Sequence, residues 1–295
     1  MEVIQILNYT GNTDNNKILI PKAALFHDIS CFGRCALSVI MPVIAVLKIQ
    51  PIAIPTALFS THTGGFENYS FLDLTCEMKK IIAHHDDLNI KFDAVYSGFL
   101  GSNEQAEIIS DFIKMQKQKN ALIFIDPVMA DGGKLYSLYS DEIKEKMINL
   151  IQYADVITPN ITEAFFLLDM QYQKPPYNKN FVNNIIYCLM DLHFGIKTVI
   201  ITSVELESGE YGVAYGERGG EIKYKFTKKY SVDYPGSGDI FSSIVCGYIL
   251  NGHNYDTAVS AAVEYIDSVI RYTMECGTPV REGLAFEKFL GDLKV

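Results

Sequence analysis

The sequence has no tryptophan, no excess of basic residues and no apolar run long enough to span a bilayer. Its longest apolar run, residues 36–47, is interrupted by Ser38 and Pro42 and ends at Lys48. Lysine and arginine number 25 against 35 aspartates and glutamates, which gives a formal net charge of −10. This charge argues against a nucleic-acid or anionic-membrane partner, because both require a basic face.

Several motifs of well-known protein classes are also missing. The chain has no GxxxxGK[ST], no GxGxxG after its first expected strand and no HRD or DFG set, which argues against P-loop, dinucleotide-binding and protein-kinase folds. The six cysteines show neither zinc-type spacing nor a CxxC pair. The N-terminal residues lack the basic and apolar regions of a secretion signal. We therefore expect a soluble cytoplasmic protein with reduced cysteines.

Short apolar runs alternate with longer helical patterns along the chain. This alternation predicts an α/β fold with a mostly parallel central sheet and helices on both faces. Residues 1–22 are expected to form an N-terminal extension and residues 23–295 a single domain. A β-hairpin is predicted late in the chain, at 211–216 and 221–227. Other strands are expected at 23–27, 52–59, 93–98, 121–126, 155–160 and 198–203, and helices at 34–48, 70–85, 103–118, 138–152, 178–193, 239–252, 255–274 and 283–290.

Polar side chains follow six successive expected strands. In open parallel sheets, ligands bind beyond the carboxyl ends of the strands. So many polar strand ends exceed what turn formation requires, and this enrichment predicts an active site. The candidates are Asp28, Ser30, Thr61, His62, Thr63, Tyr96, Ser97, Asp126, Asp131, Thr158, Asn160, Thr202 and Ser203.

The segment VDYPGSGDIFSS, residues 232–243, places a glycine-rich turn directly before a helical pattern. The free N–H groups of Gly236, Ser237 and Gly238 at such a helix start attract anions, phosphate above all. Asp239 adds a carboxylate at the same place, where it would repel phosphate. A phosphoryl-transfer enzyme needs both an anion cradle and a base, so the pair favours that chemistry. The alternative is that Asp239 only caps the helix.

Two further segments carry potential cation ligands. In TPNITE, Asn160 and Glu163 lie three residues apart, so they could hold a hydrated Mg²⁺ ion or form a helix-capping pair. In DPVMAD, Asp126 and Asp131 flank a proline turn, where they could bind a cation near phosphates or stabilise turns. The sequence leaves both pairs of alternatives open.

Two other segments, HDISCFGRCAL and FSTHTGGF, carry hydroxyl groups, an aspartate and a histidine at adjacent strand ends. These groups could hold a small polar ring. For His62, the alternative is a buried histidine whose hydrogen bonds are satisfied within the protein.

Together these segments resemble the ribokinase-like superfamily of small-molecule kinases, and within it the pyridoxal/pyridoxamine (vitamin B6) kinase branch. PGSGDIF is similar to the GTGD motif, with Ser237 in place of threonine, and TPNITE matches NxxE. DPVMAD resembles DPVxGD, with Ala130 in place of glycine, and FSTHTGG resembles SNHTG, with Thr61 in place of asparagine. The resemblance covers about residues 23–290.

The resemblance implies ATP-dependent phosphorylation of the hydroxymethyl group of pyridoxal, pyridoxamine or pyridoxine, giving the 5′-phosphate. It further implies a homodimer that needs Mg²⁺, and leaves open whether a monovalent cation assists. DISCFGR departs from the branch's SHxxxGxxG pattern, so Ser30 and Asp28 are both kept as candidates. The implied roles are Asp239 as base, Gly236, Ser237 and Gly238 as anion hole, Asp126, Asn160 and Glu163 for the metal, Thr158, Thr202, Ser203 and Asp131 for ATP, and Ser30, Asp28, Thr63, His62 and Tyr96 for the substrate.

Two alternative functions use the same fold. In the superfamily that this sequence resembles, members that phosphorylate hydroxymethylpyrimidine often carry cysteine where this chain has Asp239. The aspartate therefore favours a B6 substrate without excluding the pyrimidine. A non-catalytic protein that binds the vitamer or nucleotide would have no need of a base beside its anion site.

Overall fold

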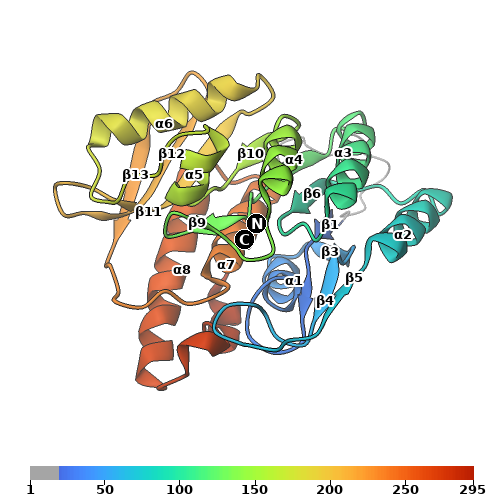
Figure 1. Cartoon of the computed structure of the whole chain (residues 1–295), viewed down its shortest axis with the longest axis horizontal. Coiled ribbons are helices and arrows are strands. Elements are labelled where there is room, and N and C mark those ends of the chain that lie inside the picture. The colour runs from blue at the N-terminus through green and yellow to red at the C-terminus, as the bar shows by residue number, and fades with distance from the viewer. Residues whose placement is uncertain (1–19) are drawn as a thin grey trace, which may run out of the picture.

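The computed structural model describes residues 20–295, which are built around an eight-stranded sheet (Figure 1). The strand order is β13-β12-β11-β10-β7-β6-β1-β3, and all neighbours pair in parallel except β12, which runs antiparallel to both β11 and β13. The predicted α/β class, with a mostly parallel sheet and a late hairpin, is confirmed. The strands are β1 (Lys22–Phe26), β3 (Gln50–Ala53), β6 (Ala94–Ser97), β7 (Leu122–Ile125), β10 (Val156–Ile157), β11 (Thr198–Glu205), β12 (Tyr211–Glu217) and β13 (Lys223–Thr227).

Helices cover both faces of this sheet. Side chains alternate between the faces along a strand, so Phe26 of β1 joins one buried cluster and Leu25 the other. Helices α2 to α6 pack on the first face, and α1, α7 and α8 on the second (Figure 1). The helices are α1 (Leu37–Val46), α2 (Thr75–Asp87), α3 (Asn103–Lys117), α4 (Asp141–Ile151), α5 (Ile161–Leu167), α6 (Lys179–Leu192), α7 (Ser237–Leu250) and α8 (Tyr255–Glu275).

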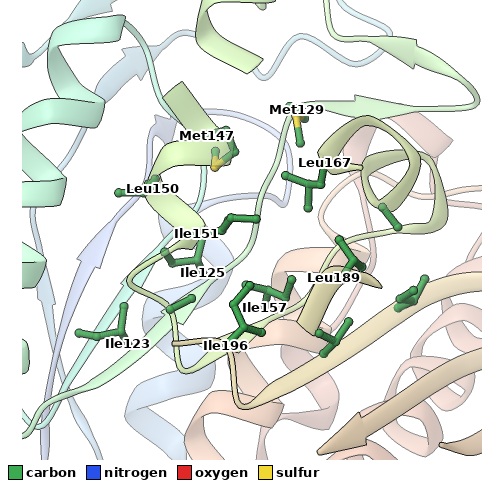
Figure 2. Close-up of a cluster of buried hydrophobic side chains, with 14 of the residues drawn as sticks. Ile123, Ile125, Met129, Met147, Leu150, Ile151, Ile157, Leu167, Leu189 and Ile196 are labelled. Atoms are coloured by element: carbon green, nitrogen blue, oxygen red, sulfur yellow. The ribbon is translucent and has the colours of Figure 1, made fainter. Parts of the chain in front are cut away.

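The first cluster is the larger core of the molecule, and Figure 2 shows its centre. Ile123 and Ile125 of β7 point to the same side, toward Met147 and Leu150 of α4. All four side chains are nearly or fully buried. Burial of this apolar surface fixes the helices on the sheet, and so fixes the positions of the strand ends from which the site is built.

One predicted strand proved wrong in its extent. Residues 52–59 form two strands in different sheets, because the chain leaves the main sheet after β3. Pro55 lies between them and has no N–H group to continue a ladder. The second strand, β4 (Ala57–Phe59), pairs instead with β2 (Ile29–Ser30) and β5 (Phe71–Asp73) in a separate three-stranded sheet.

The C-terminal prediction also needs correction. Residues 283–290 do not form an α-helix; two short 3₁₀ turns, η1 (Val280–Glu282) and η2 (Glu287–Asp292), occupy this region. Gly283 separates them with a φ of 78°, which no α-helix accommodates.

Only the end of the predicted N-terminal extension lies within the described residues. Strand β1 already begins at Lys22, whereas residues 1–19 of the predicted extension lie outside the described residues. Among the helices of residues 20–295, none combines the length and the hydropathy that crossing a membrane requires.

Candidate active site

The start of α7 is a turn that only glycine can make at its first position. Gly236 has a φ of 80°, and a Cβ there would collide with the carbonyl oxygen of Arg34. Ile240 N–H then donates to the Gly236 carbonyl at 3.0 Å and begins the helix. No side chain caps this end, so the first-turn N–H groups of Gly238 and Asp239 have no partner within the helix.

Asp239 does not cap its own helix. Its Oδ2 accepts a hydrogen bond from the backbone N–H of Ala36 at 2.8 Å, and Ala36 lies 203 residues earlier in the chain, at the start of α1. Burial raises the pKa of Asp239 to about 6, although the Ala36 hydrogen bond opposes this shift. The carboxylate is therefore ionised at neutral pH and ready to accept a proton, within one turn of the unpartnered N–H groups.

A second carboxylate lies behind the first. Asp126, at the end of β7, accepts a hydrogen bond from Ser242 Oγ at 3.0 Å. Ser242 Oγ is also 2.9 Å from Thr158 Oγ1 at the end of β10. Burial, and then the charge of Asp239, raise the pKa of Asp126 to about 8. Ser242 was not predicted from the sequence, although its position three residues after Asp239 places it on the same face of α7.

Asn160 and Glu163 form the capping box that the sequence left as an alternative. Asn160 Oδ1 accepts from the Glu163 N–H at 2.9 Å, and Glu163 Oε2 accepts from the Asn160 N–H at 2.8 Å. Glu163 Oε1 accepts from the N–H of Met129 at 3.0 Å and of Ala130 at 3.4 Å. Burial, together with the charge of Asp126, raises the pKa of Glu163. The pair thus fixes the segment that follows Asp126.

Asp131 lies in a small hairpin that the sequence did not predict, β8 (Ala130–Asp131) and β9 (Lys134–Leu135). Its side chain is exposed, and Oδ1 accepts from the Gly132 N–H at 2.7 Å. Thr202 lies on β11 next to Asn160 in the sheet, and Ser203 is exposed with a φ of 59°. Thr202 and Ser203 thus lie within β11 and Asp131 in the hairpin, and their assignment to the nucleotide stays a prediction.

The predicted substrate side is only partly assembled. Asp28 and Ser30 lie together, with Ser30 Oγ donating to Asp28 Oδ2 at 3.1 Å. Burial, and then the charge of Asp239, raise the pKa of Asp28 to about 7. Thr63 is exposed in the loop after β4.

The predicted substrate residues His62 and Tyr96 are both buried. His62 Nδ1 accepts from the Gly64 N–H at 3.1 Å, so Nε2 carries the proton and donates to the Arg281 carbonyl at 2.7 Å. Burial lowers the pKa of His62, which keeps the ring neutral. Tyr96 is fully buried against Phe124, where the charges of Asp126 and Asp239 act on its hydroxyl, and its predicted contact with the substrate stays a prediction.

The fold and this arrangement of groups define a ribokinase-like α/β kinase of small molecules. Within that class, the chain belongs to the phosphomethylpyrimidine kinase family, whose sequence model matches residues 41–282. A Bacteroides thetaiotaomicron protein assigned as a phosphomethylpyrimidine kinase, crystallised in an orthorhombic form with pyridoxal, matches with a TM-score of 0.89. It is 38% identical, and the match covers 94% of this chain and 96% of that chain.

Curated relatives are named as kinases of vitamin B6. Pyridoxal kinase PdxY of Actinobacillus pleuropneumoniae is 26% identical over 260 residues, which cover 83% of this chain and 86% of that protein. Protein C18.10 of Schizosaccharomyces pombe, assigned as a pyridoxal kinase, is 28% identical over 201 residues, or 65% of this chain. That match spans only 57% of the yeast protein. The predicted family and the predicted kinase class are both confirmed.

Two glycine variants test the start of α7. We expect Gly236→Ala to destabilise the fold by roughly 3 kcal/mol, because both the backbone conformation and the Arg34 carbonyl exclude a Cβ. Gly238→Ala is the matched control, since a methyl group added there would have no atom within 4 Å and its φ is not positive. Thermal unfolding would show a drop for the first variant alone; equal melting temperatures would contradict the tight turn.

A second test uses the raised pKa of Asp126. The folded state holds a proton there that the unfolded chain has lost, so the stability of the wild type falls as the pH rises from about 4 to 8. With a chelator present and no nucleotide, Asp126→Asn should therefore be more stable than the wild type at pH 8 by roughly 3 kcal/mol in unfolding free energy. This corresponds to a melting temperature about 5 °C higher. At pH 4.5 the two should melt together. A constant difference across this range would show that burial does not penalise the Asp126 charge.

Proposed function

We propose that this protein transfers the γ-phosphate of ATP to the hydroxymethyl group of a vitamin B6 vitamer, which gives the 5′-phosphate. The observation that carries the proposal is the start of α7, where unpartnered N–H groups and the Asp239 carboxylate lie within one helical turn. The kinship with a protein crystallised with pyridoxal and with a pyridoxal kinase supports the choice of substrate.

In the proposed reaction, Asp239 accepts the proton of the hydroxymethyl oxygen as that oxygen attacks the γ-phosphorus. The N–H groups of Gly236, Ser237 and Gly238 stabilise the negative charge on the transferred group, for which the Ser237 N–H gives up its 3.3 Å hydrogen bond to the Tyr234 carbonyl. The helix dipole of α7 adds to this stabilisation, because its positive end faces the same place. The Ala36 hydrogen bond holds the base in position throughout.

Magnesium is the metal we propose for the nucleotide. Within residues 20–295, no group of three or more histidine, cysteine or acidic side chains is arranged to hold an ion. A buried carboxylate such as Asp126, whose ionised form is disfavoured in isolation, fits a hydrated Mg²⁺ that is held mainly by phosphates. The ion would neutralise phosphate charge. Asn160 and Glu163 would act through water, since their capping box occupies most of their polar atoms.

On the nucleotide side, we propose that Thr158, Thr202, Ser203 and Asp131 contact ATP, because they lie in or after neighbouring strands. Ser30 and Thr63 would contact the vitamer. The homodimeric state and the cytoplasmic location are proposed from the family resemblance.

Hydroxymethylpyrimidine kinase is the second candidate, favoured by the description of the matching family. The two candidates differ in substrate, so a direct assay separates them. ATP and Mg²⁺ would be incubated with pyridoxal, pyridoxamine, pyridoxine, hydroxymethylpyrimidine or ribose, and the products measured by mass spectrometry. We expect phosphorylation of the B6 vitamers. If only the pyrimidine were phosphorylated, hydroxymethylpyrimidine would replace the B6 vitamer as the proposed substrate. Binding of ATP and vitamer without any product would favour a non-catalytic binding protein.

The base is tested by Asp239→Asn. We expect kcat to fall by about 10²–10⁴-fold, the usual contribution of a general base, while the protein stays folded. Asp87→Asn, at the exposed end of α2, is the control and should keep full activity. If Asp239→Asn kept the kcat of the wild type, another group would have to accept the proton.

A further inference from the structure

Asp28 is a buried carboxylate that phosphoryl transfer itself does not require. Its backbone carbonyl accepts from the Leu37 N–H at 3.1 Å, while the neighbouring Ala36 N–H binds Asp239. The start of α1 therefore binds the Asp28 backbone and the Asp239 carboxylate through successive N–H groups, and the charge of Asp239 acts on the Asp28 carboxylate. Ser30 Oγ is the one side-chain donor to Asp28 from the described part of the chain.

The groups around Asp28 supply no compensating positive charge. Asp239 approaches from α7 and disfavours its ionisation. The Cys35 thiol beside both carboxylates and the Tyr139 hydroxyl from the segment before α4 are neutral, because burial raises the pKa of each. Among the charges that act on Asp28 within residues 20–295, none comes from a lysine or arginine.

Two basic side chains near Asp28 in the sequence supply no positive charge to it. Arg34 turns away, with Nε 2.5 Å from Glu287 Oε1. His27 is almost fully buried with its ring against Tyr96, and burial lowers its pKa to about 3, which leaves it uncharged.

Ionisation of both Asp28 and Asp239 is unfavourable when no cation is bound beside them. Asp239 must be ionised to act as a base, yet a second ionised carboxylate nearby and out of water opposes that charge. A cation beside Asp28 would permit both carboxylates to be ionised together. Mg²⁺ would lie with the phosphates near Asp126, so we take the cation at Asp28 to be one that the acceptor substrate brings.

We propose that Asp28 binds the protonated ring nitrogen of the vitamer, so that the enzyme selects the pyridinium form of its substrate. This inference rests on the proposed function. One ring carbon separates the nitrogen of a B6 vitamer from the carbon that carries the hydroxymethyl group. Carboxylates whose charges act on one another can therefore serve both groups. The ammonium group of pyridoxamine is a second possible cation, but only one vitamer has it, whereas all three share the ring nitrogen.

The first test compares Asp28→Asn with the wild type on pyridoxal, pyridoxamine and pyridoxine. We expect KM to rise by about 10–100-fold for all three, the value of one charge-assisted hydrogen bond, with a smaller change in kcat. The acid limb of log(kcat/KM) against pH should have a slope of two in the wild type, because Asp28 and Asp239 must both lose a proton. In Asp28→Asn the slope should be one.

Asp87→Asn, which neutralises an exposed carboxylate at the end of α2, is the matched control and should keep the wild-type KM. It should retain the slope of two. A rise in KM confined to pyridoxamine would overturn the assignment to the ring nitrogen. An unchanged KM and slope in Asp28→Asn would overturn the role of Asp28 altogether.

A spectroscopic measurement on the wild type does not depend on the folding of any variant. Pyridoxine would be mixed with excess protein at a pH where the ring nitrogen of the free vitamer has lost its proton. We expect the near-ultraviolet absorption of the bound vitamer to be that of the protonated ring; the neutral-ring spectrum would overturn the inference. Wild-type turnover of the vitamers tests the proposed function separately, since turnover with a neutral bound ring would sink only the role of Asp28.

Discussion

The hydrogen bond from the Ala36 N–H to the Asp239 carboxylate joins the first crossover of the fold to the helix that follows the last strand. The two residues are 203 positions apart, and the rest of the site is arranged around their contact. Gly236 permits it, because only a glycine lets the Arg34 carbonyl approach the start of α7. His62 supports the same region by binding the Arg281 carbonyl, with its ring packed against Gly33. The base is therefore positioned by backbone groups, which side-chain substitutions cannot easily move.

The second constraint is electrostatic. Asp28, Asp126 and Asp239 lie within one region, and burial raises the pKa of each of them. Such a site is least stable when it is empty and fully ionised, because the charges oppose one another out of water. Ligands that bring cations relieve this repulsion. Repulsion among these carboxylates therefore contributes to the binding free energy of any ligand that brings a cation. Such cations fit on both sides of the transferred phosphoryl group.

The sequence predicted the fold well where periodicity carries the information. Alternating strands and helices implied the parallel sheet, and the glycine-rich turn with Asp239 implied the shared cradle and base. The division of residues 52–59 was not predictable, because the apolar pattern runs on across Pro55 and does not say which sheet each half joins. The full burial of Tyr96 was not predictable either, because the sequence shows a tyrosine near a strand end but not the packing around its ring. Ser242 was hidden within the apolar face of a helix. For Asn160 and Glu163, the same spacing of three residues fits a hydrated Mg²⁺ site and a helix-capping pair. Only the folded structure shows the capping box.

The order of strands in the main sheet bears on when the protein becomes functional during synthesis. From β1, the strands β6, β7, β10, β11, β12 and β13 are added outward in chain order, so each finds its neighbour soon after it is made. The start of α7 breaks this sequence, because it must return to the segment before α1. A nascent chain can therefore build much of its sheet while it still lacks its base. The proposed base is made only with the last fifth of the polypeptide, so shorter chains hold much of the sheet without Asp239.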